Sequence, residues 1–286
     1  MADFELLPEC AQDPIDAAPF HEWAFPDGPT FIVFYRTPSG YLLRFPENAD
    51  FLVTSDLAVT CAPAPDVPFS SCEHLYLNQV LPLVLAQQGK LVLHGSAVVV
   101  DGKALGFMAR AGSGKSTMAA AFAVDGCPFL TDDGLLLEPE GAGYLAMPSH
   151  PSIRLWDDSH AALLPPDAST APAVHYTSKS RFVAGAALEY CDRAAPMGTA
   201  YLLGPGDAAD VELRRLEPGQ AVHALLQHSF ILDIEDRPRL AANFDQLARL
   251  ANAVACFHLD YPRCYEDLPR VMRAIKAHAA SQDCRS

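Results

Sequence analysis

Short apolar runs separated by turn residues dominate the early part of the chain. Between residues 30 and 63 the runs are FIVFYR, GYLLRF, ADFLVT and AVTCAP, which are rich in β-branched and aromatic residues and are divided by Pro, Gly, Asn and Asp. Such runs are typical of short β-strands, and the TPSG between the first two is typical of a hairpin turn. The pattern predicts a small β-rich N-terminal section over residues 1–68.

A helix is expected after the Pro-rich connector CAPAPDVPFSS. Ser70 and Glu73 form a capping-box pattern at its start. We expect this helix to run from about Cys72 to Gln88, with Gly89 just past its end as a C-cap.

Runs with strand character and runs with helix character alternate beyond Gly89. KLVLHGSAVVV and KALGFMA predict two strands, and the Asp101-Gly102 pair between them favours a tight hairpin. KSTMAAAFAVDG predicts a helix that ends at Gly126, and CPFLTDDG predicts a short buried strand. Residues 141–200, which are dense in Pro, Ala and Ser, indicate loops around a few strands.

The C-terminal part continues the alternation. TAYLLGP predicts a strand, AVHALLQHS a short helix, RLAANFDQLARLANAV a long helix, ACFHLDYP a strand, and YEDLPRVMRAIKAHAA a closing helix with apolar residues near helical spacing. Because strands alternate with helices, we expect an α/β domain over residues 69–286.

Composition and charge narrow the classes of function. The 286 residues include 20 Lys and Arg against 35 Asp and Glu, a net charge of −15 that repels nucleic acid. The 8 cysteines include no C-x-x-C pair, so neither zinc-ribbon nor thioredoxin-type spacing is present. MADFELLPEC has no secretory-signal pattern, and no apolar run approaches the roughly 20 residues that span a bilayer. We expect a cytoplasmic protein without nucleic-acid or membrane partners, and the oligomeric state, homo-oligomers included, stays open.

The stretch ARAGSGKS, from Ala109 to Ser116, matches the phosphate-loop pattern G-x-x-x-x-G-K-[ST] apart from its first glycine. Gly112 and Gly114 allow the backbone N–H groups to turn toward phosphate oxygens, and the helix that follows adds its positive end. Lys115 would reach the β and γ phosphates, and the Ser116 hydroxyl would ligate Mg²⁺. The alternative is an ordinary Gly-rich turn that caps an Ala-rich helix. The predicted nucleotide-binding residues are Ala111, Gly112, Ser113, Gly114, Lys115, Ser116 and Thr117.

Two adjacent carboxylates, Asp132 and Asp133, follow the apolar PFL one helix after the loop; we call them the acid pair. We expect them at the carboxyl end of a strand beside the loop, where open α/β sheets bind ligands. One would hold Mg²⁺, directly or through water, and the other would accept a proton from an attacking hydroxyl. The alternative is a surface turn in which Asp makes local hydrogen bonds. His94 lies on the preceding strand, and a lone His there is more often a hydrogen-bonded core residue than a catalyst.

Taken together, LHGSAVVVDGKALGFMARAGSGKS and the FLTDD that follows it resemble the bacterial HPr serine kinase/phosphorylase family and its shorter HPr-kinase-like relatives, which include kinases of lasso-peptide precursors. The resemblance covers about residues 90 to 135. It implies a P-loop fold related to phosphoenolpyruvate carboxykinase, binding of ATP and Mg²⁺, and transfer of the γ-phosphoryl group to a serine hydroxyl.

The resemblance also implies roles for single residues. By it Lys115 contacts phosphates, Ser116 and Asp132 hold the metal, Asp133 is the base that activates the acceptor, and His94 and Asp132 support the site.

The chain departs from the family pattern at two points. The family loop begins with Gly where this chain has Ala109, and the family's glutamate before an isoleucine-arginine-glycine signature is matched only by SIRLW, with Ser152 in place of the acid and Arg154 kept. Ser152 leaves a second metal ligand in question. Arg154 would contact the phosphoryl group or the acceptor. In a chain with few bases, HYTSKSRF also carries Lys179 and Arg181, which would make the same contacts or else belong to a solubilising loop.

The sequence therefore predicts an ATP-dependent serine kinase acting on a peptide or small protein, such as a ribosomally made precursor peptide. Two alternatives stay open, an ATP-binding sensor or scaffold that transfers nothing and a small-molecule kinase. A transporter-type ATPase is disfavoured because the chain has no L-S-G-G-Q signature. The sequence identifies neither the acceptor nor whether the reverse phosphorolysis occurs.

Overall fold

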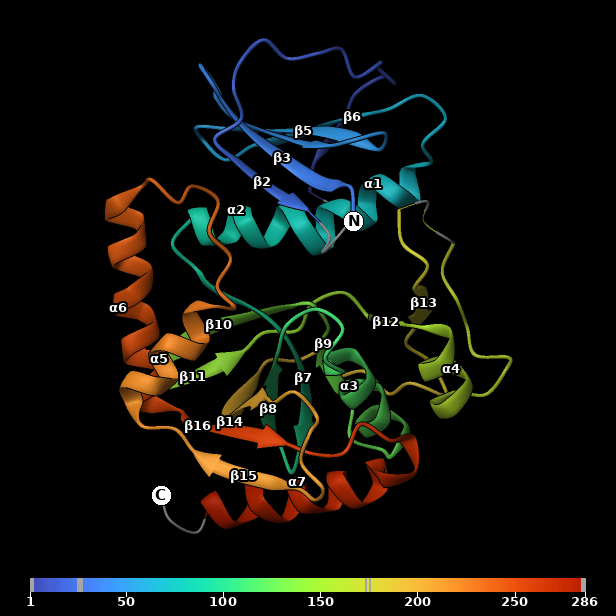
Figure 1. The fold of residues 1–286 in the computed structure, drawn as a ribbon, viewed down its shortest axis with the longest axis vertical. Coiled ribbons are helices and arrows are strands. Elements are labelled where there is room, and N and C mark those ends of the chain that lie inside the picture. The colour runs from blue at the N-terminus through green and yellow to red at the C-terminus, as the bar shows by residue number, and fades with distance from the viewer. Residues whose placement is uncertain (1–2, 25–27, 173, 175, 284–286) are drawn as a thin grey trace. The chain divides into compact units, whose positions relative to one another are not determined.

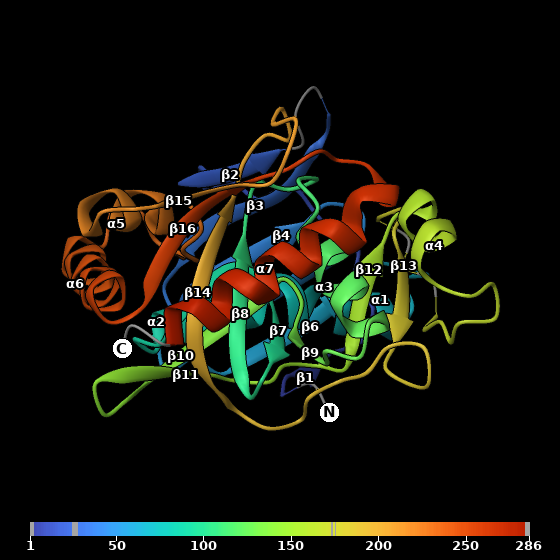
Figure 2. The same ribbon diagram turned by 90° about the horizontal axis from the view of Figure 1, so that it is seen from below.

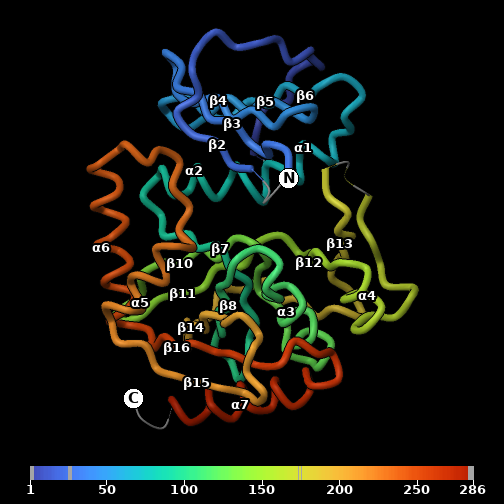
Figure 3. The backbone as a smooth tube through the Cα atoms, in the orientation of Figure 1, coloured from blue at the N-terminus to red at the C-terminus, as the bar shows by residue number. Residues whose placement is uncertain are grey.

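The computed structural model describes residues 3–24, 28–172, 174 and 176–283 and divides the chain into two compact units. Unit 1 comprises Met1–Gln88 and Pro172–Ser178, and unit 2 comprises Gly89–Ala171 and Lys179–Ser286. Figure 1 labels the elements, and Figure 3 traces the backbone of the same units. The helical segment before Gly89, predicted to belong to the second domain, groups with the first unit.

Unit 1 is built around a six-stranded sheet in the order β1-β6-β5-β4-β3-β2, antiparallel except where β1 pairs with β6. The strands predicted between residues 30 and 63 are confirmed. Alternate residues of β5 and β6, among them Phe51, Val53 and Cys61, are buried, so one face of this sheet packs on a core. The strands are β1 Glu5–Leu6, β2 His21–Ala24, β3 Thr30–Thr37, β4 Gly40–Phe45, β5 Ala49–Thr54 and β6 Val59–Pro63.

The helical segment of unit 1 starts earlier than predicted. It consists of α1 (Phe69–Leu75), a π-helical turn (Tyr76–Val80) and α2 (Leu81–Gln87). Pro68, with extended backbone, is the residue before the first turn, so Ser70 and Glu73 lie inside the helix and form no capping box. Proline starts the helix because its fixed φ suits the entry and it needs no hydrogen-bond acceptor. The predicted end is confirmed, since Gly89 follows with φ +83°.

Unit 2 contains an eight-stranded sheet in the order β11-β10-β7-β8-β14-β16-β15, with β9 paired to β7. Strands β8, β14 and β16 are parallel to one another, and the other pairings of this sheet are antiparallel. The predicted hairpin between β7 and β8 is confirmed, with Asp101 and Gly102 both at positive φ. The strands are β7 Leu91–Val100, β8 Lys103–Met108, β9 Phe129–Thr131, β10 Gly134–Glu140, β11 Gly143–Ala146, β14 Ala195–Leu203, β15 Glu212–Arg215 and β16 Ala255–Asp260.

Helices cover both faces of the unit 2 sheet. Along β8, Leu105 and Phe107 point into the core under α3 (Lys115–Val124) and α7 (Leu268–Asp283). The alternate residues Ala104 and Met108 point into the core shared with α5 (Pro218–Leu226) and α6 (Arg237–Ala253). Figure 2 looks onto the α7 side of the sheet. The α/β class predicted from the alternation of strands and helices is thus confirmed, and the predicted helices and strands of the C-terminal part are present.

The middle region holds a helix that the sequence pattern did not predict. The two short strands β12 (Ser152–Leu155) and β13 (Ser180–Val183) form a separate antiparallel pair, and α4 (Asp157–Leu163) follows β12. Within the described part of the chain, no helix combines the length and the apolar character that a membrane crossing requires.

Candidate functional site

The glycine loop, residues 109–116, connects β8 to α3 as predicted. Gly112 and Gly114 have φ of +80° and +86°, a region that strains residues with a side chain. Gly114 is also the residue that precedes α3. The first N–H groups of a helix have no acceptor within the helix, so the loop presents the positive end of α3 at the edge of the sheet.

Lys115 is the first residue of α3 and is only 6% exposed. Its ammonium donates to the carbonyl oxygens of Ala109 at 2.8 Å and Arg110 at 3.2 Å, which closes the loop on itself. Burial lowers the pKa of Lys115, the acid pair opposes this shift, and nearby cations reinforce it. An ammonium held only by neutral carbonyls would bind charged phosphate oxygens more strongly than its present partners.

The acid pair follows directly after β9, and Asp132 lies against the loop. Its Oδ1 accepts hydrogen bonds from the hydroxyls of Ser96 at 2.6 Å and Ser116 at 2.9 Å. Its Oδ2 accepts from the backbone N–H of Arg154 at 3.1 Å. The structure therefore brings the loop serine and the first acid of the pair into direct contact, and both side chains are buried.

The backbone of Asp133 lies in the left-handed region, with φ +69°. Its carboxylate forms an ion pair with the Arg154 guanidinium. Its carbonyl accepts hydrogen bonds from Gly95 N at 3.3 Å and from His94 Nδ1 at 3.2 Å. A left-handed conformation costs about 1–2 kcal/mol for a residue with a side chain, so these surrounding contacts must hold Asp133 in place.

The two carboxyl groups are shifted in opposite directions. Burial, together with the neighbouring charge of Asp133, raises the pKa of Asp132 above its usual range. Burial would also raise the pKa of Asp133, but the charges of Arg154, His94 and Lys179 outweigh it and lower that pKa. Asp133 therefore carries its negative charge at neutral pH, whereas Asp132 lies where an added cation would favour the charged form.

Histidines line the same region. Burial and the charge of Lys115 lower the pKa of His94 to about 4, so its ring is neutral near pH 7. Because the carbonyl of Asp133 can only accept, Nδ1 of His94 carries the proton and Nε2 is left as an acceptor. The backbone N–H of His94 donates to the carbonyl of His228 at 2.6 Å. His94, which the sequence placed near the loop, thus contacts the acid pair.

Two further histidines were missed by sequence reasoning. Burial lowers the pKa of His150 to about 4, with Asp133 opposing and Arg181 reinforcing the shift. Burial and the charge of Lys115 likewise lower the pKa of His228 to about 4. His150 precedes β12 and His228 follows α5, and no sequence pattern links either position to the loop.

Cations gather on the β12–β13 side of the acid pair. Arg154 on β12 lies opposite Arg181 on β13, and Lys179 comes just before β13. The Lys179 ammonium lies 5.3 Å from the centre of the ring of Trp156, a side chain that is 45% exposed. The Nε of Arg181 is buried without a hydrogen-bond partner among the described residues. The structure thus places the three predicted cations around Asp133 and its neighbours.

One predicted residue uses its hydroxyl elsewhere, and the position where the family pattern has an acid holds a serine. The Thr117 hydroxyl is hydrogen-bonded to the hydroxyl of Ser159 on α4 at 3.1 Å, so the backbone N–H of Thr117, in the first turn of α3, is the group left for a phosphate contact. Ser152 is buried at the start of β12 and supplies no carboxylate.

The donor set suits Mg²⁺ bound together with a nucleotide. Among the described residues, no group of three or more His, Cys, Asp or Glu is arranged to hold a metal by itself. Ser116 and Asp132 offer adjacent oxygen donors, and Mg²⁺ is usually bound by one or two protein oxygens while phosphates and water complete its shell. The residues present therefore fit the metal that the glycine loop implies.

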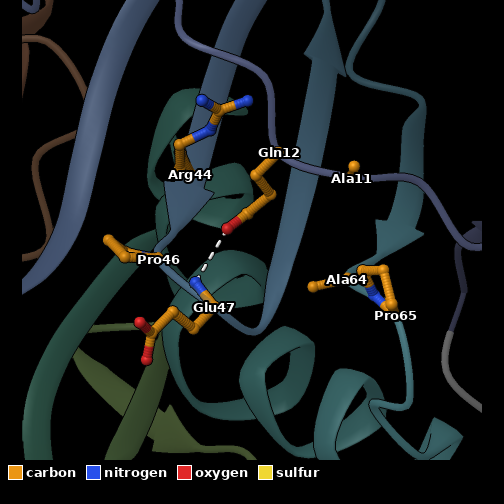
Figure 4. A pocket seen from close by; sticks show the side chains of 7 residues that line it. All are labelled: Ala11, Gln12, Arg44, Pro46, Glu47, Ala64 and Pro65. Carbon is orange, nitrogen blue, oxygen red and sulfur yellow. Dashed lines mark hydrogen bonds between the residues drawn. The ribbon is translucent and has the colours of Figure 1, made fainter.

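A cavity of about 420 Å³ in unit 1 lacks these features. Its lining residues are Ala11, Gln12, Arg44, Pro46, Glu47, Ala64 and Pro65 (Figure 4). Gln12 accepts from Glu47 N at 2.7 Å and donates to Asp50 at 2.8 Å, and Arg44 is paired with the same Asp50 carboxylate. Because these polar groups satisfy one another, the cavity is typical of a structural contact.

Comparison with known proteins shows similarity to solved structures. No family model and no curated protein matches the sequence. Among solved structures, the chain is similar to the Hpr(Ser) kinase/phosphatase from Coxiella burnetii, with 11% sequence identity and a TM-score of 0.36 over 67% of this chain and 98% of that one. The function proposed below rests on the motifs and on the geometry of the site.

Proposed function

We propose that this chain is an ATP-dependent serine kinase that transfers the γ-phosphoryl group of ATP to a serine hydroxyl of a peptide or small protein. The single observation that carries the proposal is the contact between the loop and the acid pair, in which Ser116 Oγ lies 2.9 Å from Asp132 Oδ1. A phosphoryl-transfer site needs a loop that binds the phosphates, two groups that hold the metal and a further carboxylate that does not bind the metal.

Binding would use the glycine loop. Its N–H groups and the N-terminus of α3 would bind the β and γ phosphates, and the Lys115 ammonium would exchange the carbonyls of Ala109 and Arg110 for phosphate oxygens. Ser116 and Asp132 would hold Mg²⁺, which supplies neutralisation of the charge that develops on the phosphate oxygens. In this arrangement Asp132 orients the Ser116 hydroxyl through their hydrogen bond.

Asp133 would act on the acceptor. Its carboxylate would accept the hydrogen bond of the serine hydroxyl and take its proton as the oxygen attacks the γ-phosphorus and the bond to the β–γ bridging oxygen breaks, which releases ADP. The lowered pKa of Asp133 keeps it deprotonated for this role. A strong base is not required, because the loose transition state of phosphoryl transfer delays proton loss until bonding is advanced.

The cations beside Asp133 would stabilise the transferring group. Arg154, Lys179 and Arg181 converge near the acid pair in a chain whose net charge is −15, so the site is a cationic region on an acidic protein. Preorganised cations of this kind stabilise charge in the transition state because they need no rearrangement during the reaction. His94 holds the backbone of Asp133 through its carbonyl and thereby positions the base.

A second candidate function is an ATP-dependent sensor or scaffold that transfers nothing. Ser152 favours it, because the HPr-kinase-like pattern has an acid at this position and this chain has a buried hydroxyl there. A kinase with a small-molecule acceptor would use the same loop and acid pair.

The experiment is a transfer assay with ATP, Mg²⁺ and serine-containing peptides, read by mass spectrometry. We expect one phosphate on serine in the presence of Mg²⁺ and none after chelation. Tight calorimetric ATP binding without product from any peptide would select the sensor, whereas product from a free hydroxyl compound alone would select the small-molecule kinase. Failure of ATP to bind would contradict all three functions.

A further inference from the structure

The order of the unit 2 sheet separates the two ends of a nucleotide bound on the glycine loop. Strands β8, β14 and β16 are parallel, so their carboxyl ends share one edge of the sheet. The acid pair follows β9, which pairs with β7 on one side of β8, whereas β14 and β16 lie on the other side. A triphosphate whose γ end meets the acid pair therefore extends its nucleoside toward the ends of β14 and β16.

The residue after β16 lies beside the glycine loop. Tyr261 is buried, and a Cβ built on Gly114 would lie 3.6 Å from its hydroxyl oxygen. Burial raises the pKa of Tyr261 to about 12, so the hydroxyl stays neutral. The Tyr261 ring therefore links the loop to the chain that follows β16.

The guanidinium of Arg263 lies over the face of the Tyr261 ring. Its guanidinium carbon lies 3.9 Å from the centre of the Tyr261 ring, and its Nη2 donates to the carbonyl of Gly204 at 2.6 Å. A Cβ built on Gly206 would lie 3.0 Å from Arg263 Nε, so the glycine leaves the space that the side chain occupies. Arg263 is nevertheless exposed. Fixing an exposed arginine costs up to about 2 kcal/mol of side-chain entropy. The contacts with Tyr261 and Gly204 must offset this cost, so the guanidinium is held ready at the surface.

The turn that carries these contacts is itself braced. Asp260, at the end of β16, accepts hydrogen bonds from Gly206 N at 2.7 Å and from Ala208 N at 3.3 Å. The segment after β14 is thus tied to the end of β16, and the carbonyl that receives Arg263 is held in place.

We propose that Arg263 is the stacking platform for the purine base of the nucleotide, with the guanidinium face turned away from Tyr261 as the binding surface. This inference rests on the proposed function only in requiring a nucleotide on the glycine loop. A planar guanidinium stacks on aromatic faces and tolerates either purine, so it adds affinity for the base without selecting adenine over guanine.

Calorimetric titration of Arg263→Ala with Mg²⁺-ATP and with Mg²⁺-tripolyphosphate separates base from phosphate contacts. We expect about tenfold weaker binding of ATP and unchanged binding of tripolyphosphate. Arg263→Lys, which keeps the charge but loses the plane, should weaken ATP binding to a similar degree. GTP should bind the wild-type chain about as tightly as ATP. Arg270→Ala is the matched control, because Arg270 is a partly exposed arginine of the same unit paired with Asp210 and Asp267, and it should change neither affinity.

Equal weakening of ATP and tripolyphosphate by Arg263→Ala would overturn the proposal and make Arg263 a phosphate contact. Unchanged ATP affinity, full rescue by Arg263→Lys, or no ATP binding by the wild type would also overturn it. The kinase proposal is tested separately by phosphate transfer: a wild-type chain that binds ATP through Arg263 but yields no phosphoserine would refute the kinase and leave this inference standing.

Discussion

Two arginine–aspartate pairs, one in each unit, show what separates a structural contact from a candidate active site. In unit 1, Arg44 and Asp50 lie directly opposite each other on adjacent antiparallel strands. Arg44 Nε and Nη2 reach the two Asp50 oxygens at 2.9 and 2.6 Å, and Gln12 donates to the same carboxylate at 2.8 Å. Charge and hydrogen-bonding capacity are balanced within this group.

The pair of unit 2, Arg154 with Asp133, is not balanced in this way. Asp133 has a left-handed backbone, and the charges of both Lys179 and Arg154 lower the pKa of its carboxyl group. The hydrogen-bonding capacity of Arg181 nearby is not fully used within the described residues. An excess of positive charge at a strained carboxylate beside a glycine loop is what the proposed nucleotide site requires, whereas an ion pair alone is not.

Replacing the acid of the unit 2 pair should impair phosphate transfer, whereas replacing the acid of the unit 1 pair should lower stability. The larger effect is expected for Asp133→Asn. It removes the proposed acceptor of the serine proton, so phosphate transfer should fall about 10³-fold while ATP affinity changes little. Transfer rates and calorimetric ATP titration on the same preparation check this. Loss of ATP binding in place of transfer would instead assign Asp133 to the metal.

Lys115→Met tests whether the glycine loop of unit 2 binds the nucleotide. The variant would lose the proposed charge-assisted contact to phosphate, which should weaken ATP binding on the order of 50-fold. Lys276→Met, which breaks an ion pair with Asp125, is the control and should not change ATP affinity. Equal ATP affinities for Lys115→Met and the wild type would show that the ammonium does not face the phosphates.

Asp50→Asn is the counterpart in unit 1. Removing one charge of a mostly buried pair leaves Arg44 without its full partner, so we expect a loss of about 1–3 kcal/mol of unfolding free energy. Urea unfolding measures this loss, and the rate of phosphate transfer should not change. A fall in transfer comparable to that of Asp133→Asn would remove the distinction between the two pairs.

The effect expected last, because it is absent at neutral pH, is a pH dependence of stability from the buried histidines around the acid pair. The pKa of His150 is about 4 in the folded chain against 6.5 for an ordinary histidine, so between these values the unfolded chain binds a proton that the folded chain does not. Stability should fall as the pH drops from about 6.5 to about 4 and should be insensitive to this group above that window.

Thermal melts of the wild type and of His150→Gln across this window test the effect. The melting temperature of the variant should fall by several degrees less than that of the wild type. Parallel curves for the two proteins would show that His150 is not held neutral by the fold.

Local signals in the sequence were sufficient to predict the positions of the loop, the acid pair and most strands. The Asp101-Gly102 turn and the glycine loop depend on backbone conformations that particular residues permit, so they can be recognised from a few neighbouring positions. The start of the unit 1 helix was predicted wrongly, because Pro68 determines the entry and the Ser70–Glu73 pattern was given priority over it.

The rest of the candidate site depends on contacts between distant segments. His150 comes near Asp133, and His228 comes near Lys115, only when the chain around β12 and after α5 folds. No periodicity in the sequence predicts these contacts. The helix α4 was missed because the Pro- and Ala-rich composition of its surroundings masks a segment of only 7 residues. Lys179 and Arg181 were found by charge, since cations are rare in this chain.

The central claim is that Lys115, Ser116 and the acid pair surround one triphosphate and its magnesium. A crystal structure with Mg²⁺ and a non-hydrolysable ATP analogue tests it most directly. We predict the β and γ phosphates on the glycine loop with Lys115, a metal about 2.1 Å from Ser116 Oγ with Asp132 in its first or second shell, and the Asp133 carboxylate facing the γ-phosphate. A nucleotide bound elsewhere, or a triphosphate on the loop with both aspartates turned away from it, would contradict the account.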